Sequence, residues 1–178
     1  MHTLKMGVVG HRTVDDPAAA ADEVRRALGL ARSPEPGDQA IGAPVHLEVY
    51  SALAEGADRL AAGVLLDVPG AALVAVLPMA ADDYLADFPS AESKAAFLTL
   101  LDRAARVHVI GPTPSRVEGY ERAGRRIVDV CDALIALWDG EPSRGRGGTA
   151  EIVAYAQGSA VPVFWIRTNR GTVSLQRI

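Results

Sequence analysis

The stretch CDALIALWDGEPSRGRGGTAEIVAYA, residues 131–156, decides the fold of this chain. Residues 133–138 form an apolar run of strand length, a glycine-rich segment follows, and residues 148–157 have the composition of a helix. A strand that passes through a glycine-rich loop into a helix is typical of sheets in which parallel strands alternate with helices. The stretch therefore predicts an α/β domain.

The same glycine-rich loop predicts a binding site for an anion. Gly145, Gly147 and Gly148 permit close approach of the backbone to a ligand, and the first amides of the following helix point toward an anion such as phosphate. Thr149 adds a hydroxyl donor. The alternative is that these glycines only make a flexible turn. Because the loop directly follows a strand, we expect a phosphate site.

Outward from this stretch, apolar runs and helical patterns alternate. Further strands are predicted at residues 4–9, 45–50, 71–77, 106–110 and 161–166, and helices at 17–31, 54–66, 90–105 and 118–130, with a loop or short helical turn at 82–88. Such alternation implies a mostly parallel sheet with ligands outside the carboxyl ends of its strands. We predict one Rossmann-like three-layer α/β/α domain of about six strands over residues 1–167, followed by a C-terminal tail of unclear structure over 168–178.

Length and composition agree with this class. A chain of 178 residues is long enough to enclose a sheet between two helical layers. Hydrophobic residues make up 49% of the chain and aromatic residues only 5%, so the core must consist mainly of Ala, Val, Leu and Ile. Such a core suits buried parallel strands covered by helices.

Charge and residue usage narrow the expected partners. The formal net charge is −4 and no block of Lys and Arg is present, so nucleic acid is not an expected partner. No apolar run is long enough to span a bilayer, and the single Cys131 has no intramolecular disulfide partner, so we expect a cytoplasmic protein without membrane contact. The four histidines show no metal-ligand spacing, and we predict neither a metal nor a cofactor.

Candidate ligand residues follow the first predicted strand. Gly10 ends this strand and places His11 and Arg12 at the expected mouth of the site. Arg12 either binds a phosphate through two hydrogen bonds of its guanidinium or is an ordinary surface arginine. His11 either donates a hydrogen bond to the ligand or caps the loop.

Further candidates accompany the later strands. Gly56 is expected to let a backbone approach the ligand, and Asp58 either caps the second helix or holds sugar hydroxyls. Asp139 either binds a ribose or organises the turn after the fifth strand. Trp138 and Tyr120 either stack on a base or pack against the protein.

Three segments of the chain resemble the SLOG superfamily of Smf/DprA DNA-processing proteins and LOG-like phosphoribohydrolases. GVVGHR, residues 7–12, looks like the strand and glycine turn that open these domains. SALAEGADRLAAGVLL, residues 51–66, is similar to a serine, glycine and aspartate pattern of the Smf/DprA branch, which adds Ser51 to the candidate ligand residues. GRGGTAE, residues 145–151, is similar to the PGGxGTxxE signature of the LOG branch and to a helix start of nucleoside deoxyribosyltransferases.

Two residues receive a catalytic role through this resemblance. Glu151 occupies the position of a LOG glutamate implicated in cleaving an N-glycosidic bond, where a carboxylate can stabilise positive charge on the sugar. Its other role is to offset the dipole of the helix that it begins. Arg122 corresponds to an upstream LOG arginine with one residue of difference in spacing, and Arg125 and Arg126 are its rivals. Each arginine either contacts phosphate or is solvated.

The resemblance implies binding of a nucleotide or a nucleotide-derived phosphorylated molecule, as a sensor or a nucleotide-processing component. The alternative is an enzyme that cleaves or exchanges the N-glycosidic bond of nucleoside monophosphates. The LOG signature opens with Pro-Gly-Gly whereas residues 143–146 read SRGR, so we expect binding without rapid turnover. A DNA-processing role is disfavoured by the acidic net charge. The predicted helix at 90–105 has more apolar surface than one narrow stripe, which predicts a homo-oligomer.

Overall fold

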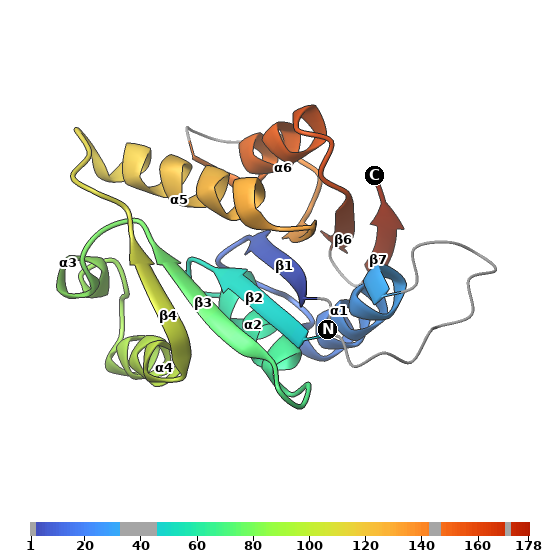
Figure 1. The fold of residues 1–178 in the computed structure, drawn as a ribbon, viewed down its shortest axis with the longest axis horizontal. Helices are drawn as coiled ribbons and strands as arrows, with labels where there is room; N and C mark the ends of the chain where they lie inside the picture. Colours follow the sequence, from blue (N-terminus) through green and yellow to red (C-terminus); the bar gives the residue numbers. More distant parts are fainter. Residues whose placement is uncertain (1–2, 33–45, 143–146, 170–171) are drawn as a thin grey trace.

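Strands and helices alternate along the chain, as the sequence predicts. The computed structural model describes residues 3–32, 46–142, 147–169 and 172–178 (Figure 1). The strands are β1 (Thr3–Gly10), β2 (His46–Ser51), β3 (Ala72–Leu77), β4 (Ala104–Val109), β5 (Ala133–Trp138), β6 (Val163–Asn169) and β7 (Thr172–Arg177). The helices are α1 (Pro17–Arg32), α2 (Ala57–Leu66), α3 (Ala81–Leu85), α4 (Ala91–Asp102), α5 (Arg116–Val130) and α6 (Thr149–Gly158).

Side-chain caps fix where several helices begin. The carboxylate of Asp16 accepts a hydrogen bond of 3.0 Å from the amide three residues further on, and Pro17 occupies the first position of α1. The hydroxyls of Ser90 and Ser115 cap α4 and α5 in the same way, at 3.1 and 3.2 Å. These caps satisfy amides that have no partner within the helix.

The order of the strands creates a switch point at the centre of the sheet. The order is β4-β3-β2-β1-β5-β6-β7, in which β1 to β6 are parallel and β7 runs antiparallel to β6. From β1 the chain moves outward through β2 and β3 to β4, and then returns to the other side of β1 at β5. The direction of winding therefore reverses between β1 and β5, where open α/β sheets form a crevice at their carboxyl ends.

Helices lie on both faces of the sheet, which makes the three-layer architecture that the sequence predicts (Figure 1). Helices α1, α2 and α4 pack on one face, with Val24, Leu65 and Phe97 in the core. Helices α5 and α6 pack on the other, with Ile127 and Ile152 in a second cluster. Within the described ranges, no helix is long and apolar enough to cross a membrane.

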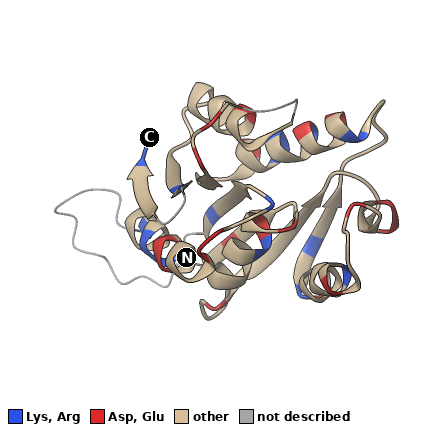
Figure 2. Cartoon of the chain, turned by 180° about the vertical axis from the view of Figure 1, so that it is seen from behind, with Lys and Arg blue, Asp and Glu red and all other residues tan. Residues whose placement is uncertain are grey.

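In the described part of the chain, acidic and basic residues intermix along the helices and loops (Figure 2). On α1, Arg25 pairs with Asp22 at 2.9 Å. On α5, Arg125 pairs with Glu121 at 2.8 Å. Exposed pairs one helical turn apart contribute little to stability, but they neutralise much of the local charge.

Several element boundaries differ from the predicted ones by one to three residues, those of α2, α4 and β4 among them. Helix α2 begins at Ala57 and not at residue 54, because Leu53 and Gly56 have positive φ angles of 57° and 85° that a helix cannot continue. Helix α4 ends at Asp102 and β4 begins at Ala104, where the sequence analysis extended the helix to residue 105. Apolar periodicity alone does not separate a short strand from the end of a helix.

The tail that had no sequence-based assignment completes the sheet. TVSLQR, Thr172–Arg177, forms β7 and pairs with β6 in the register Ile166↔Leu175. The strand contributes only partly buried side chains to the core, Val173 and Leu175 among them. Its polar composition explains why the hydrophobic pattern did not reveal it.

Candidate ligand site at the carboxyl ends of the strands

Three of the predicted ligand-binding loops meet at one edge of the sheet. β2, β1 and β5 are neighbours and parallel, so Ser51, Gly10 and Trp138 end their strands on the same side. The amide of His11 donates to the carbonyl of Leu137 at 3.0 Å. The loop after β1 is thereby attached to β5, across the switch point.

Two predicted site glycines serve the packing of this loop against α2. A Cβ atom added at Gly10 would lie 2.4 Å from the Cβ of Ala57 and 2.6 Å from the carbonyl oxygen of Leu137. One added at Gly56 would lie 2.1 Å from the carbonyl oxygen of Arg12. Gly56 was expected to admit a ligand, but the main chain of Arg12 occupies that space.

Gly147, which lies just before α6, packs on α5. A Cβ atom added at Gly147 would lie 3.1 Å from the carbonyl oxygen of Val117 and 3.5 Å from the Cβ of Tyr120. Gly148 is the N-cap residue of α6, and Thr149 is its first helical residue. Gly145, the third glycine of the predicted anion site, lies outside the described residues.

Tyr120 lies where these loops converge. The guanidinium carbon of Arg12 is 6.0 Å from the centre of its ring. The Tyr120 hydroxyl donates a hydrogen bond to Asp87, which follows α3. Burial and this hydrogen bond raise the pKa of Tyr120 to about 12. The ring of Tyr120 therefore lies near Arg12 of the loop after β1, Gly147 before α6 and Asp87 after α3.

His11 and Asp139 lie close together after the carboxyl ends of β1 and β5. His11 Nε2 is 3.8 Å from Asp139 Oδ1. The same oxygen accepts the amide of Glu141 at 2.9 Å, so Asp139 organises the turn after β5. Trp138 packs its ring on Trp165 with centroids 5.1 Å apart and donates through Nε1 to the carbonyl of Glu141 at 2.8 Å.

The two residues assigned catalytic roles have structural partners. Glu151 Oε2 accepts the amide of Gly147, the residue before the N-cap of α6, at 2.7 Å, so Glu151 holds the chain at the start of this helix. Arg122 forms an ion pair with Glu118 on the exposed side of α5. Among the described contacts, none joins Glu151 and Arg122.

Beneath the loop after β2 lie two buried polar side chains that the sequence analysis had singled out. Ser51 is fully buried, and its hydroxyl accepts the amide of Leu53 at 3.0 Å, which holds the turn with positive φ. Asp58 is 4% exposed and accepts the amide of Ala54 at 3.4 Å. Burial raises the pKa of Asp58 to about 7, although the Ala54 hydrogen bond and the charges of Arg59 and Arg12 oppose the rise.

Two polar residues beside Asp58 were not predicted. Tyr84 is completely buried, and its hydroxyl makes no hydrogen bond to a described residue. Burial, and then the negative charge of Asp58, raise the pKa of Tyr84. Arg59 donates to the carbonyls of Leu53 at 3.0 Å and Ser93 at 2.8 Å, while its Nη2 has no partner among the described residues. Buried polar atoms without partners are uncommon and mark this cluster as a place for bound water or a ligand group.

No group of three metal-ligating side chains occurs among the residues that the structure describes. No protein-family model matches the chain, and no curated protein matches its sequence. Membership of the SLOG superfamily therefore remains a prediction from the three segments described above.

Proposed function

We propose that the protein binds a nucleotide or a nucleotide-derived phosphorylated molecule in the crevice between the loops after β1 and β5. The observation that carries this proposal is the position of Arg12. Its side chain is exposed beside Tyr120 at the switch point of the sheet, and its guanidinium makes no hydrogen bond or ion pair with a described residue. An arginine fork in this position is suited to bind phosphate oxygens.

The start of α6 supports the same ligand. The amides of Thr149 and Ala150 donate to no described residue, and they belong to the positive end of the helix dipole. Glu151 already holds the amide of Gly147. A phosphate group would therefore bind to the amides of Thr149 and Ala150 together with the guanidinium of Arg12.

The contacts of Glu151 and Arg122 favour binding over cleavage of an N-glycosidic bond. Arg122 has a partner on its own helix, and Glu151 has one in the residue just before the N-cap of α6. A cleavage site requires groups placed to within about 1 Å of the reacting atoms, which binding does not. We infer a binding or sensing role.

Calorimetry with AMP, dAMP and ADP-ribose tests the proposal. Arg12→Gln is expected to weaken the binding of the best of these ligands about tenfold, since one hydrogen bond to a charged group contributes about 1.5 kcal/mol or more. Arg25→Gln is the matched control, because Arg25 is an exposed arginine on α1 with an Asp22 partner. Equal affinity of the two variants, or no binding by the unaltered protein, would contradict the proposal.

The proposal extends to pairing of two copies through α4. Leu98 is 47% exposed, and the neighbouring Ala95 and Ala96 are exposed as well. Lys94 and Asp102 lie one turn before and one turn after Leu98, and neither forms an ion pair with a described residue. An antiparallel twofold arrangement centred on Leu98 would place Lys94 of each copy opposite Asp102 of the other.

A further inference from the structure

Part of one sheet face carries no helix from the described residues. On this face α5 contacts β1 and β3, and α6 contacts β5, β6 and β1. On this face no described helix lies over the beginnings of β2, β3 and β4 (Figure 1), while Tyr50, Val74 and Val76 are only 8%, 5% and 1% exposed. Parallel sheets are ordinarily covered on both faces, so this part of the face needs a separate explanation.

This part of the face contains a groove of about 380 Å³. Val74 and Val76 of β3 line it, together with Tyr50, Arg106, His108 and Arg126 from β2, β4 and α5. This volume lies within the usual range of small-molecule sites. The groove therefore combines apolar side chains from the middle of the sheet with cationic side chains from two different elements.

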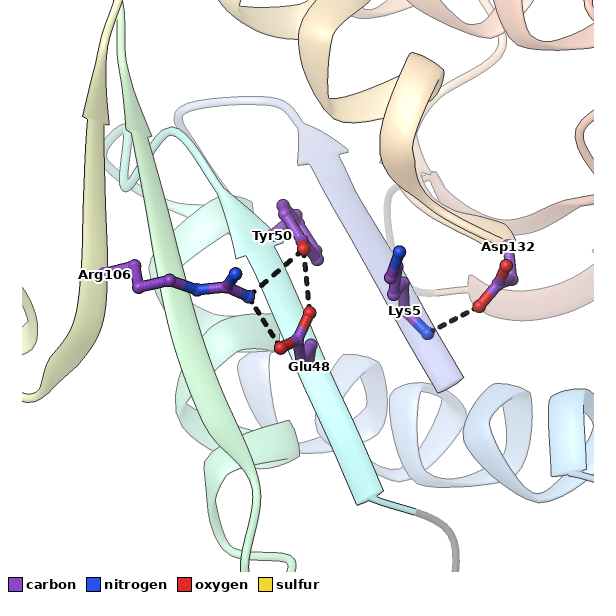
Figure 3. Close-up of polar contacts among 5 residues, drawn as sticks. All are labelled: Lys5, Glu48, Tyr50, Arg106 and Asp132. Atoms are coloured by element: carbon purple, nitrogen blue, oxygen red, sulfur yellow. Dashed lines mark hydrogen bonds and ion pairs between the residues drawn. The ribbon is translucent and has the colours of Figure 1, made fainter. Parts of the chain in front are cut away.

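A fixed ion pair forms one side of the groove. Arg106 reaches across β3 and donates to Glu48 at 2.6 Å, and the hydroxyl of Tyr50 donates to the same carboxylate at 2.8 Å (Figure 3). Burial raises the pKa of Glu48, but the Tyr50 hydrogen bond and the charges of Arg106 and Lys5 outweigh it and lower the pKa. Glu48 thus remains ionised and neutralises Arg106, one of the two arginines that line the groove.

Arg126 adds a positive charge that none of the described residues neutralises. Arg116, Arg122 and Arg125 of the same helix pair with Asp87, Glu118 and Glu121. Arg126 forms no ion pair or hydrogen bond with any residue of the described part of the chain. This positive charge lies at the same groove as Val74 and Val76, whose side chains are 5% and 1% exposed.

We propose that the groove binds a small organic carboxylate. Its apolar body would lie over Val74 and Val76, and its carboxylate would be taken by the guanidinium of Arg126. The planar fork of an arginine matches a planar carboxylate, and the valines favour an aromatic or aliphatic body. This site is separate from the crevice, since Arg126 is ten residues, about 15 Å, along α5 from Arg116 at the carboxyl edge.

An NMR titration of the full ¹⁵N-labelled chain with 1-naphthoate tests the proposal. We expect saturable shifts of the amides around Val74, Val76 and His108, and weaker binding of the uncharged 1-naphthalenemethanol. Arg126→Gln should weaken the binding of 1-naphthoate about tenfold. Arg125→Gln should leave it unchanged, because Arg125 points to the Tyr155 ring, 4.8 Å away, and not to the groove.

Three results would overturn the proposal: shifts that map elsewhere, equal binding of the uncharged analogue, or equal affinity in the two arginine variants. Shifts at the same residues that depend on protein concentration without 1-naphthoate would assign this face to a second copy of the chain and overturn it too. Arg12→Gln serves as a further control. Unchanged binding of 1-naphthoate by this variant is expected, and it keeps this test independent of the nucleotide proposal.

Discussion

The carbonyl oxygen of Arg12 lies 2.1 Å from the position that a Cβ atom at Gly56 would take. The loop after β1 and the start of α2 are therefore in direct main-chain contact. The amide of Ala57 strengthens this contact by donating to the carbonyl of His11 at 2.9 Å. The position of Arg12, and with it the proposed phosphate site, depends on a glycine at residue 56.

Gly56→Ala is expected to destabilise the protein strongly. Its φ of 85° costs about 1–3 kcal/mol for a residue with a side chain, and the collision with Arg12 adds to this. We expect the free energy of unfolding, measured in urea, to fall by about 3 kcal/mol or more. Gly70→Ala is the matched control, since Gly70 has a φ of 79° and open space around it, and it should cost only about 1–2 kcal/mol. Similar losses in both variants would show that the contact with Arg12 is unimportant.

Asp58→Asn is expected to change how stability depends on pH. The pKa of Asp58 is about 7 in the folded protein and 3.8 for an ordinary aspartate. Between pH 4 and 7 the unfolded chain releases this proton first, so the contribution of Asp58 to folding becomes less favourable as pH rises. Above pH 7 the loss of folding stability caused by Asp58 no longer changes with pH. The difference between its folded and unfolded pKa values limits this loss to about 4 kcal/mol.

The Asn variant lacks this titration and should be more stable than the unaltered protein at pH 8, but not at pH 4. Urea unfolding across this range gives the difference between the two proteins. Parallel stability curves would mean that Asp58 ionises in the folded protein as it does in the unfolded chain. The amide oxygen of Asn can still accept the hydrogen bond from Ala54, so the comparison isolates the charge.

Glu151→Ala is expected to lower stability by about 1 kcal/mol through the loss of the contact with Gly147. Glu151→Gln retains an acceptor and should lose less. Chromatography of AMP and dAMP incubated with the unaltered protein is expected to show no release of base above the rate in buffer. Release at an enzyme-like rate that Glu151→Gln abolishes, with affinity retained, would replace the binding role by N-glycosidic cleavage.

The sequence predicted the fold well because apolar runs separated by helical patterns are a local signal. The same signal was weak for β7, whose TVSLQR is polar and is held by pairing with β6. At the site, the loops after β1 and β5 were predicted from their glycines. Tyr84 was not, because only the packing of α3 against α2 brings it beside Asp58. Arg59 follows Asp58 in the sequence, but its contact with Ser93 depends on the packing of α4.

Pairing through α4 makes a prediction about charge reversal. Lys94→Glu would place like charges opposite each other in the proposed twofold arrangement and should weaken self-association at least fivefold. Adding Asp102→Lys would reverse both charges, re-form both pairs and restore the affinity to within about twofold, because exposed ion pairs contribute up to about 1 kcal/mol each. Sedimentation velocity over micromolar to millimolar concentrations measures these changes. A single 18.7 kDa species throughout, or a double variant as weak as Lys94→Glu alone, would exclude this interface.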